Sequence, residues 1–531
     1  MCVTALHAQN SEISGARIRA HVKFLASDLL EGRGVGTRGG ELAQEYIATQ
    51  FALGGAKPGA GNGSFFQKIS LLGVEPQPSS RISIVRDGVT TDLRWSDDFI
   101  GNTMRQQSQV DFEAEAVFVG HGIAAPEYQW DDFKDVDVSG KVVVLFTNEP
   151  VSDDPKLFGG KALTYYGRWT YKYEEALRRG AAGCIILHTT PTATYGWDVV
   201  RSSWGKEDPQ VKLAEGEKSL AFAGWITAEA GNKLLAASGH SVEELIKAAG
   251  QRDFRPIPLG VKIRAALALK VRPIESANVV AIVEGSDPKL KGEAVVFSAH
   301  WDHLGVGDPV NGDRIYNGAV DNASGVGMVI EMARAWAQLR HKPRRSAIFI
   351  AVTAEESGLR GSEYFAAHPP IPAGKMQLNL NFDSFYPFGK STDVSVTGAE
   401  RTSAYPLVEE AARRFRLAIT PDPQPEKGHY YRSDHFAFAK FGVPAFSINP
   451  ADGLAGRTKA EGAKLKGGYD DKNYHQPSDE YKENWDFAGM EQLSQFGFTI
   501  GLSAANHPKL FTWREGDEFL DARVKSGVKL D

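Results

Sequence analysis

Nearly continuous hydrophobic runs at 278–283, 294–298 and 347–352 recur in the second half of the chain. Such runs lack a polar face, which is typical of strands covered on both sides of a sheet. Two further strands are predicted at 378–382 and 443–448. Helical patterns separate several of them, as at 325–339 and 487–505, where hydrophobic residues recur at steps of three and four. This alternation predicts an α/β fold with a mixed, largely parallel sheet and helices on both faces.

The first residues of the chain follow a helical pattern as well. Hydrophobic positions recur at Ile18, Val22, Leu25 and Leu29, and a second helical run covers 41–53. The stretch between them, 31–40, is rich in glycine, but no strand precedes it, so its order is not that of a dinucleotide-binding loop. We interpret it as a loop between two helices.

The chain changes character from about residue 70. Short alternating runs at 81–85, 116–119 and 141–146 are separated by Gly, Pro and Asp, which indicates a β-rich segment. A helix over 173–183, closed by glycine, leads into a strand at 184–187. The first pattern returns near residue 274.

The balance of charged residues limits the kinds of partner that are expected. The 531 residues include 60 basic and 66 acidic side chains, a net charge of -6, and these charges are interspersed. We therefore expect neither a nucleic acid nor an anionic membrane as partner. No apolar run approaches the roughly 20 residues that a membrane-spanning helix needs. The length predicts two or three domains.

The cysteines and the first residues of the chain indicate the cellular compartment in which the protein is expected. Cys2 and Cys184 are the only cysteines, so no disulfide framework is expected, and Cys184 fits a small buried hydrophobe. Residues 1–10 form a short stretch of mainly small and apolar residues. The stretch resembles the end of a secretory signal peptide without its basic region. We expect a secreted or periplasmic protein.

Acidic and imidazole side chains follow the ends of the predicted strands. They are His300 and Asp302, Glu355 and Glu356, and Asp383. In open α/β sheets, ligands bind outside the carboxyl ends of the strands, so these side chains should converge. Asp321, just before a predicted helix, and His475, in a late loop, are further candidates.

Such a cluster suits metal ions. Crowded carboxylates raise one another's pKa unless cations neutralise them. The mixture of imidazoles and carboxylates suits zinc. In a two-metal site one carboxylate usually bridges, and Asp321 is the candidate for this role. Adjacent Glu355 and Glu356 should point in different directions, so that one can bind metal while the other remains free as a base.

Five motifs in order resemble the M28 family of zinc aminopeptidases. They are HWDHLG at 300–305, VDNASG at 320–325, AEESGLRGS at 354–362, NFD at 381–383 and YHQPSD at 474–479. The segment after residue 73 is similar to a protease-associated domain. The resemblance implies a zinc exopeptidase fold built from 11–72 and 271–531, interrupted by an inserted domain at 73–270 with its core at about 110–235.

The resemblance also implies roles for individual residues. Two Zn²⁺ ions are expected, one held by His300 and Asp383 and the other by Glu356 and His475, with Asp321 bridging. Glu355 would act as the general base that deprotonates the attacking water and passes the proton to the leaving amine.

Other residues near these motifs receive weaker assignments. Asp302 would support His300, and Tyr474 would either hydrogen-bond the oxyanion or simply pack in its loop. The stretch 428–436 resembles the border of the family's substrate pocket, where Arg432 or His435 could touch substrate. His303 and His435 do not occupy metal positions of the family, and Trp301 stands where the family commonly has Tyr.

The expected function is removal of N-terminal residues from peptides. A carboxypeptidase or dipeptidase on the same scaffold is the alternative, with Arg360 or Arg432 binding a terminal carboxylate. A glutaminyl cyclase would dispense with the first His, and a non-catalytic binding ectodomain would have lost ligands, whereas no ligand is missing here. Side-chain preference, oligomeric state, the metal bound in the cell and the role of the inserted domain are not predicted.

Overall fold

The computed structural model describes residues 13–61, 63–154 and 156–529. The expected signal-peptide remnant at 1–10 lies outside these ranges. The chain forms two compact units. Unit 1 comprises 1–69, 275–422 and 432–531, and unit 2 comprises 70–274 and 423–431.

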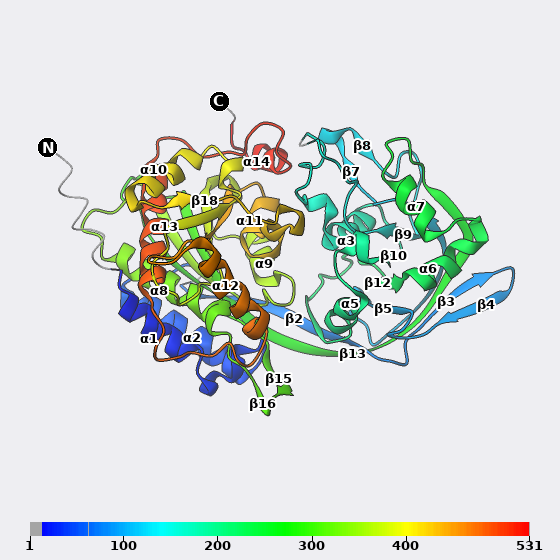
Figure 1. The fold of residues 1–531 in the computed structure, drawn as a ribbon, viewed down its shortest axis with the longest axis horizontal. Coiled ribbons are helices and arrows are strands. Elements are labelled where there is room, and N and C mark those ends of the chain that lie inside the picture. Colours follow the sequence, from blue (N-terminus) through cyan, green and yellow to red (C-terminus); the bar gives the residue numbers. More distant parts are fainter. Residues whose placement is uncertain (1–12, 62, 155, 530–531) are drawn as a thin grey trace. The chain divides into compact units, whose positions relative to one another are not determined.

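A mixed sheet forms the centre of unit 1 (Figure 1). In spatial order its strands are β1 (Lys57–Pro58), the end of β13 (Ile257–Val283), β17 (Ser346–Val352), β14 (Ala294–His300), β18 (Met376–Phe382), β21 (Ala445–Pro450), β19 (Asp393–Thr397) and β20 (Ala418–Ile419). The middle strands β17, β14, β18 and β21 are parallel, whereas β13 and β19 pair antiparallel to their inner neighbours. The predicted fold class is confirmed.

Helices cover both faces of this sheet. One layer contains α1 (Gly15–Leu25), α2 (Arg38–Gly54), α8 (Gly325–Ala337), α10 (Tyr405–Phe415) and α13 (Ala488–Asn506). Val295, Phe297 and Ala299 of β14 join the core under these helices. The alternate residues of β14 face the other side, where α11 (His435–Lys440) packs on α9 (Arg360–Ala367) and on β18.

The structure differs from the sequence-based expectation near residue 31. A 3₁₀ helix, η2 (Asp28–Arg33), follows α1, and α2 already begins at Arg38. The expected loop over 31–40 is therefore too long at both ends, since η2 ends at Arg33 and α2 begins at Arg38. Within η2, Glu31 and Gly32 form a non-helical kink with positive φ angles of 47° and 68°. A hairpin of β15 (Gly305–Val310) and β16 (Asp313–Tyr316) and the helix α12 (Lys459–Asn473) were also not predicted.

Unit 2 contains its own sheet. Its strands are β3 (Arg81–Arg86), β4 (Val89–Leu93), β5 (Phe99–Asn102), β6 (Gln109–Phe118), β9 (Val142–Phe146), β10 (Gly183–His188), β12 (Phe222–Thr227) and the first part of β13. Strands β6, β9, β10 and β12 are parallel neighbours, and the others pair antiparallel. The α-helices of its described residues are α3 (Trp169–Arg178), α4 (Thr190–Ala193), α5 (Trp197–Trp204), α6 (Ala228–Leu235) and α7 (Val242–Ala249). The likeness of this unit to a protease-associated domain stays a prediction.

Two of the connections between the units are strands. β2 (Phe66–Pro76) carries the chain into unit 2, and β13 carries it back. Residues 423–431 also belong to unit 2, where the Leu163 amide donates to the Pro425 carbonyl at 3.0 Å.

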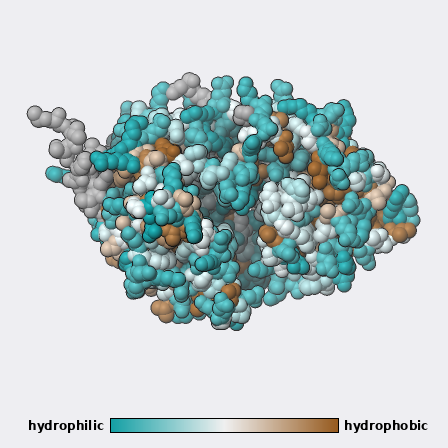
Figure 2. All heavy atoms as spheres, viewed as in Figure 1, coloured by the Kyte–Doolittle hydropathy of each residue, from teal (hydrophilic) through white to brown (hydrophobic). Residues whose placement is uncertain are grey.

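Hydrophilic side chains cover most of the face shown in Figure 2, and hydrophobic ones lie in small groups. Among the described residues, no helix combines the length and hydropathy that crossing a membrane requires.

Candidate metal centre

Three parallel strands end beside one another and deliver the first group of site residues. His300 is the last residue of β14, and Asp383 directly follows β18. Glu355 and Glu356 lie just beyond the end of β17, the other neighbour of β14. Because parallel strands place their carboxyl ends at the same edge, the sheet itself brings these side chains together.

Asp321 enters the site from the turn before α8. It lies in an irregular helical turn, η6 (Ala319–Ser324), and the peptide bond between Asp321 and Asn322 is cis. The Asn322 side chain donates to the Phe382 carbonyl at 3.0 Å and accepts from the Gly325 amide at 2.9 Å. These bonds tie the Asp321 turn both to the end of β18 and to the start of α8.

The two carboxylate oxygens of Asp321 face different imidazoles. Oδ1 lies 3.2 Å from Nε2 of His300, and Oδ2 lies 3.3 Å from Nε2 of His475. His475 reaches this position from the loop after α12, with a φ of 56°. Asp321 thus stands between two nitrogen donors with one oxygen directed to each.

The remaining carboxylates complete two neighbouring groups. Oδ1 of Asp383 lies 3.4 Å from Nε2 of His300, and Oε2 of Glu356 lies 3.0 Å from Nε2 of His475. Two sets of donor atoms each fall within 4.8 Å of one another: His300, Glu355 and Asp383, and His300, Asp321 and Glu356. The structure therefore brings together all five predicted ligands and the predicted base.

The donor set fits divalent cations. Imidazole nitrogens and carboxylate oxygens are ligands that zinc accepts, so these side chains could hold zinc.

The charges of the cluster shift its pKa values strongly. Burial alone would lower the pKa of His300, but Glu355 and Asp383 hold it well above its usual value. Burial would likewise lower the pKa of His475, yet Glu356 and Asp321 raise it to about 10. Burial and Asp321 would raise the pKa of Glu356, whereas His475 and His303 lower it to about 2. The carboxylates thus create a strong preference for positive charge at this place.

Glu355 differs from its neighbour Glu356. Burial raises the pKa of Glu355 well above its usual value, and the negative charges of Asp434 and Asp383 add to this effect. The pKa values of the two adjacent side chains are therefore shifted in opposite directions.

Asp302 supports the site differently from the expectation. Nδ1 of His300 lies 3.1 Å from the backbone carbonyl of Asp302 and 3.9 Å from its carboxylate. The carboxylate instead accepts from the backbone amides of Glu355 at 3.1 Å and Glu356 at 3.4 Å. Asp302 therefore holds the turn that carries both glutamates, while its main chain orients His300.

The residues expected near the substrate differ in their exposure to solvent. Tyr474 is 55% exposed, and its ring stacks on His475 with 3.9 Å between centroids. Arg432 is exposed, whereas His435 is only 1% exposed. Of the two candidate substrate contacts, Arg432 alone presents its side chain to solvent.

Three further residues support the site, a role that the sequence did not predict for them. Nδ1 of His303 lies 2.6 Å from Oε1 of Glu356. Ser433 donates to Oδ2 of Asp383 at 2.6 Å. Asp479 accepts from the backbone amides of Val320 at 2.9 Å and Asp321 at 3.1 Å. His303 and Asp479 lie in the same motifs as His300 and His475, and this proximity was the available signal.

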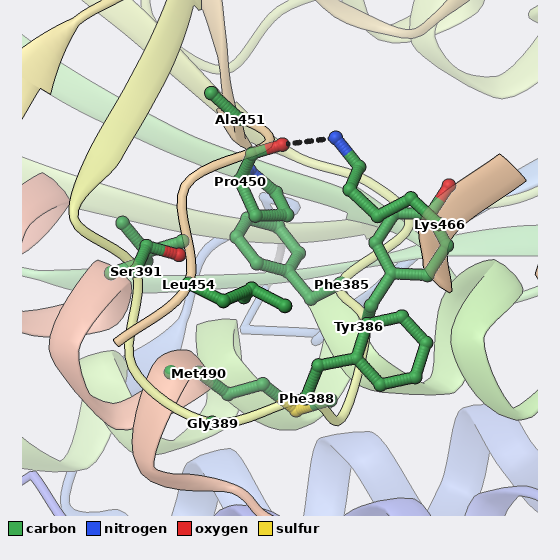
Figure 3. A pocket seen from close by; sticks show the side chains of 12 residues that line it. Phe385, Tyr386, Phe388, Gly389, Ser391, Pro450, Ala451, Leu454, Lys466 and Met490 are labelled. Atoms are coloured by element: carbon green, nitrogen blue, oxygen red, sulfur yellow. Dashed lines mark hydrogen bonds between the residues drawn. The ribbon is translucent and has the colours of Figure 1, made fainter. Parts of the chain in front are cut away.

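A small cavity lies next to the segment after Asp383 (Figure 3). It is lined mainly by hydrophobic groups, among them Phe385, Leu454 and Met490, and Lys466 closes one side by donating to the Pro450 carbonyl at 2.8 Å. Its volume of about 10 Å³ has room for about one water molecule. It is therefore too small to receive a peptide side chain.

Comparison with known proteins places the site in a family context. Residues 278–495 match the model of Peptidase family M28. A "Probable zinc metalloprotease" of Pyricularia oryzae is 40% identical over 94 residues, 18% of this chain and 18% of that protein. A "probable leucine aminopeptidase 2" of Aspergillus oryzae is 27% identical over 237 residues, 43% of this chain and 42% of that protein. The chain thus spans less than half the length of these curated relatives.

A solved structure shares the fold. An aminopeptidase from Aneurinibacillus sp. strain AM-1 aligns over 95% of this chain and 97% of its own, with a TM-score of 0.52 and 19% sequence identity.

Proposed function

Because residues 278–495 match the model of Peptidase family M28, we propose that the protein is a zinc-dependent aminopeptidase with two metal ions in one site. The observation that carries this proposal is the position of Asp321, whose two oxygens face the imidazoles of His300 and His475 at 3.2 and 3.3 Å. The zinc metalloprotease and the leucine aminopeptidase among its relatives support the choice of metal and of reaction.

The residues present would hold the metals in two overlapping sets. His300 and Asp383 would bind one ion, Glu356 and His475 would bind the other, and Asp321 would bridge. When bound, Zn²⁺ supplies Lewis-acid polarisation and makes water a nucleophile near neutral pH.

The protein's own contribution is proton transfer and orientation. Glu355 would take a proton from the attacking water and give it to the leaving amine. Asp302 would keep Glu355 at the correct place, because its carboxylate holds the Glu355 amide at 3.1 Å. Tyr474, whose ring lies against His475 and is partly exposed to solvent, would donate to the oxyanion of the tetrahedral intermediate.

The preference for a free N-terminus follows from the charge of the site. Glu355 and Asp383 lie in the same group of donor atoms as His300 and form a negative patch for a substrate ammonium. A terminal carboxylate would be repelled by these side chains. The competing carboxypeptidase or dipeptidase activity would rely on the exposed Arg432.

The decisive experiment compares amino-acid anilides with N-blocked dipeptides, using protein of measured zinc content. We expect release from the anilides only, with about two zinc ions per chain. Cleavage of the blocked dipeptides alone would overturn the aminopeptidase assignment, and fewer than about two zinc ions after reconstitution would overturn the two-metal site.

We also propose that the protein acts outside the cytoplasm. The support is the small, apolar character of residues 1–9. Cell fractionation of the native source tests this, since recovery of the protein from the cytoplasmic fraction would contradict it.

A further inference from the structure

Arg33, in the 3₁₀ helix η2, is a buried cation beside the proposed metal centre. Its side chain is 1% exposed and makes hydrogen bonds only to backbone carbonyls. Nε donates to Trp301 at 2.8 Å, Nη1 to Leu25 and Asn317 at 2.6 Å each, and Nη2 to Gly318 at 2.8 Å. Among the described residues, no carboxylate lies within ion-pair distance of it.

The acceptors of Arg33 belong to the loops that carry metal ligands. Trp301 lies between His300 and Asp302, and Asn317 and Gly318 precede Asp321. A single guanidinium therefore joins the loop of the first ligand to the loop of the bridging ligand. The planar, five-donor group can do this because its geometry is rigid, which a lysine ammonium cannot imitate.

The backbone around Arg33 is shaped for this contact. Arg33 itself has a φ of 51°, a conformation that non-glycine residues adopt only when neighbouring contacts fix it. A Cβ on Gly32 would lie 2.5 Å from the carbonyl oxygens of Gly305 and Tyr316. η2 thus approaches the backbone of the same two loops closely, and the Asn317 side chain bonds back to Asp28 at 2.8 Å.

We propose that Arg33 is a positioning residue for the metal centre: by clamping the Trp301 and Asn317–Gly318 carbonyls it sets the separation of His300 and Asp321, and with it the affinity for zinc. This inference rests on the proposed function, because it takes those two residues as ligands. It assigns a role to the glycine-rich segment near the N-terminus.

Arg523 provides a matched control. It is also buried and also donates only to carbonyls, with Nε 3.0 Å from Phe511, Nη1 3.0 Å from Ala373 and Nη2 2.9 Å from Met376. None of these acceptors adjoins a proposed ligand. Replacement of either arginine should destabilise the fold, so only an effect on metal binding separates the two.

The experiment compares R33K and R523K in the full chain by zinc titration against a competing chelator, with thermal melting and steady-state kinetics. We expect both variants to melt at lower temperature, but only R33K to bind zinc roughly 10- to 100-fold more weakly, with kcat reduced and KM little changed. Because R33K retains the positive charge, the weaker zinc binding would be due to loss of the planar guanidinium geometry.

Several outcomes would overturn the inference. Equal zinc affinities of R33K and R523K would show that Arg33 is merely structural, even if the wild type binds zinc and cleaves peptides normally. A wild type that binds no zinc would instead refute the proposed function. Should R33K fail to fold, D28A loosens η2 on the same loop by removing the bond between Asp28 and the Asn317 side chain. An unchanged zinc affinity in D28A would show that the hold of η2 on this loop does not set the affinity, which would refute the proposal.

Discussion

The imidazole of His303 holds one oxygen of the Glu356 carboxylate, with Nδ1 2.6 Å from Oε1. The other oxygen, Oε2, remains directed at His475, 3.0 Å away. Because this contact already fixes one oxygen, the side chain of Glu356 is held in one rotamer. This would lower the entropic cost of binding a metal ion.

Removing this imidazole should weaken metal binding without removing a ligand. For H303F we expect a zinc affinity reduced by about 10- to 100-fold, measured by competition with a chelator. H341F, at an exposed position of the same unit, is the control and should bind zinc as the wild type does. Wild-type affinity in H303F would show that Glu356 needs no such partner.

Substitution of Glu355 and substitution of Glu356 should impair the protein in different ways. In E355Q the proton acceptor is lost but the ligands remain, so kcat should fall by about 10²- to 10⁴-fold with zinc content unchanged. In E356Q a ligand oxygen is replaced, so zinc content itself should fall. Zinc analysis beside anilide hydrolysis distinguishes the two, and loss of zinc in E355Q would mean that the roles are assigned the wrong way round.

Asp479 should hold the backbone of Asp321, the proposed bridging ligand, in place. Its carboxylate accepts from the amides of Val320 and Asp321 and from the Tyr469 hydroxyl at 2.6 Å. In D479N these donors lose a charged acceptor, so we expect about 1 to 3 kcal/mol less stability to unfolding and weaker zinc binding. D470N, which alters the bond to the Tyr386 hydroxyl, is the control. Urea titration and zinc competition on both variants measure the difference, and equal zinc affinities would contradict this role.

His121 should make unit 2 sensitive to acid. Burial, assisted by the charge of Lys172, lowers the pKa of His121 to about 3 from an ordinary value of 6.5. Between these values the unfolded chain takes up a proton that the folded chain does not. Stability should therefore fall as pH drops below 6.5, by at most about 1.4 kcal/mol per pH unit from this group.

Thermal melting between pH 7 and about 4.5 tests this prediction. H121Q should melt with a weaker dependence on pH than the wild type, since its side chain does not titrate. H240Q, which alters a partly exposed histidine of the same unit, should keep the wild-type dependence. Parallel curves for H121Q and the wild type would show that His121 is not a source of the acid sensitivity.

The sequence predicted the parts of the site that follow from strand order. His300, the two glutamates and Asp383 lie at the ends of buried strands, and parallel pairing of β14 with β17 and β18 brings strand ends to one edge. Asp321 and His475 were placed by the family motifs, because loops carry no periodic pattern that reveals where they fold.

The rest of the site escaped prediction for physical reasons. Arg33 acts through backbone carbonyls far away in sequence, and such contacts leave no trace in local residue patterns. Helix α12 was missed because its side chains are exposed or half-buried, with Gly462 alone buried, so no hydrophobic stripe marks it. Its one local signal is the capping box of Thr458 and Glu461.

The pairing of β2 with β13 has a consequence for how such a chain can arise. An insertion whose ends emerge side by side lengthens a single loop of its host, and the entropy of closing a loop grows only slowly with length. Some 205 residues, Ser70–Ile274, can therefore interrupt unit 1 without displacing the helices that precede them. A module inserted at this point leaves the contacts of the buried Arg33 within unit 1 unchanged.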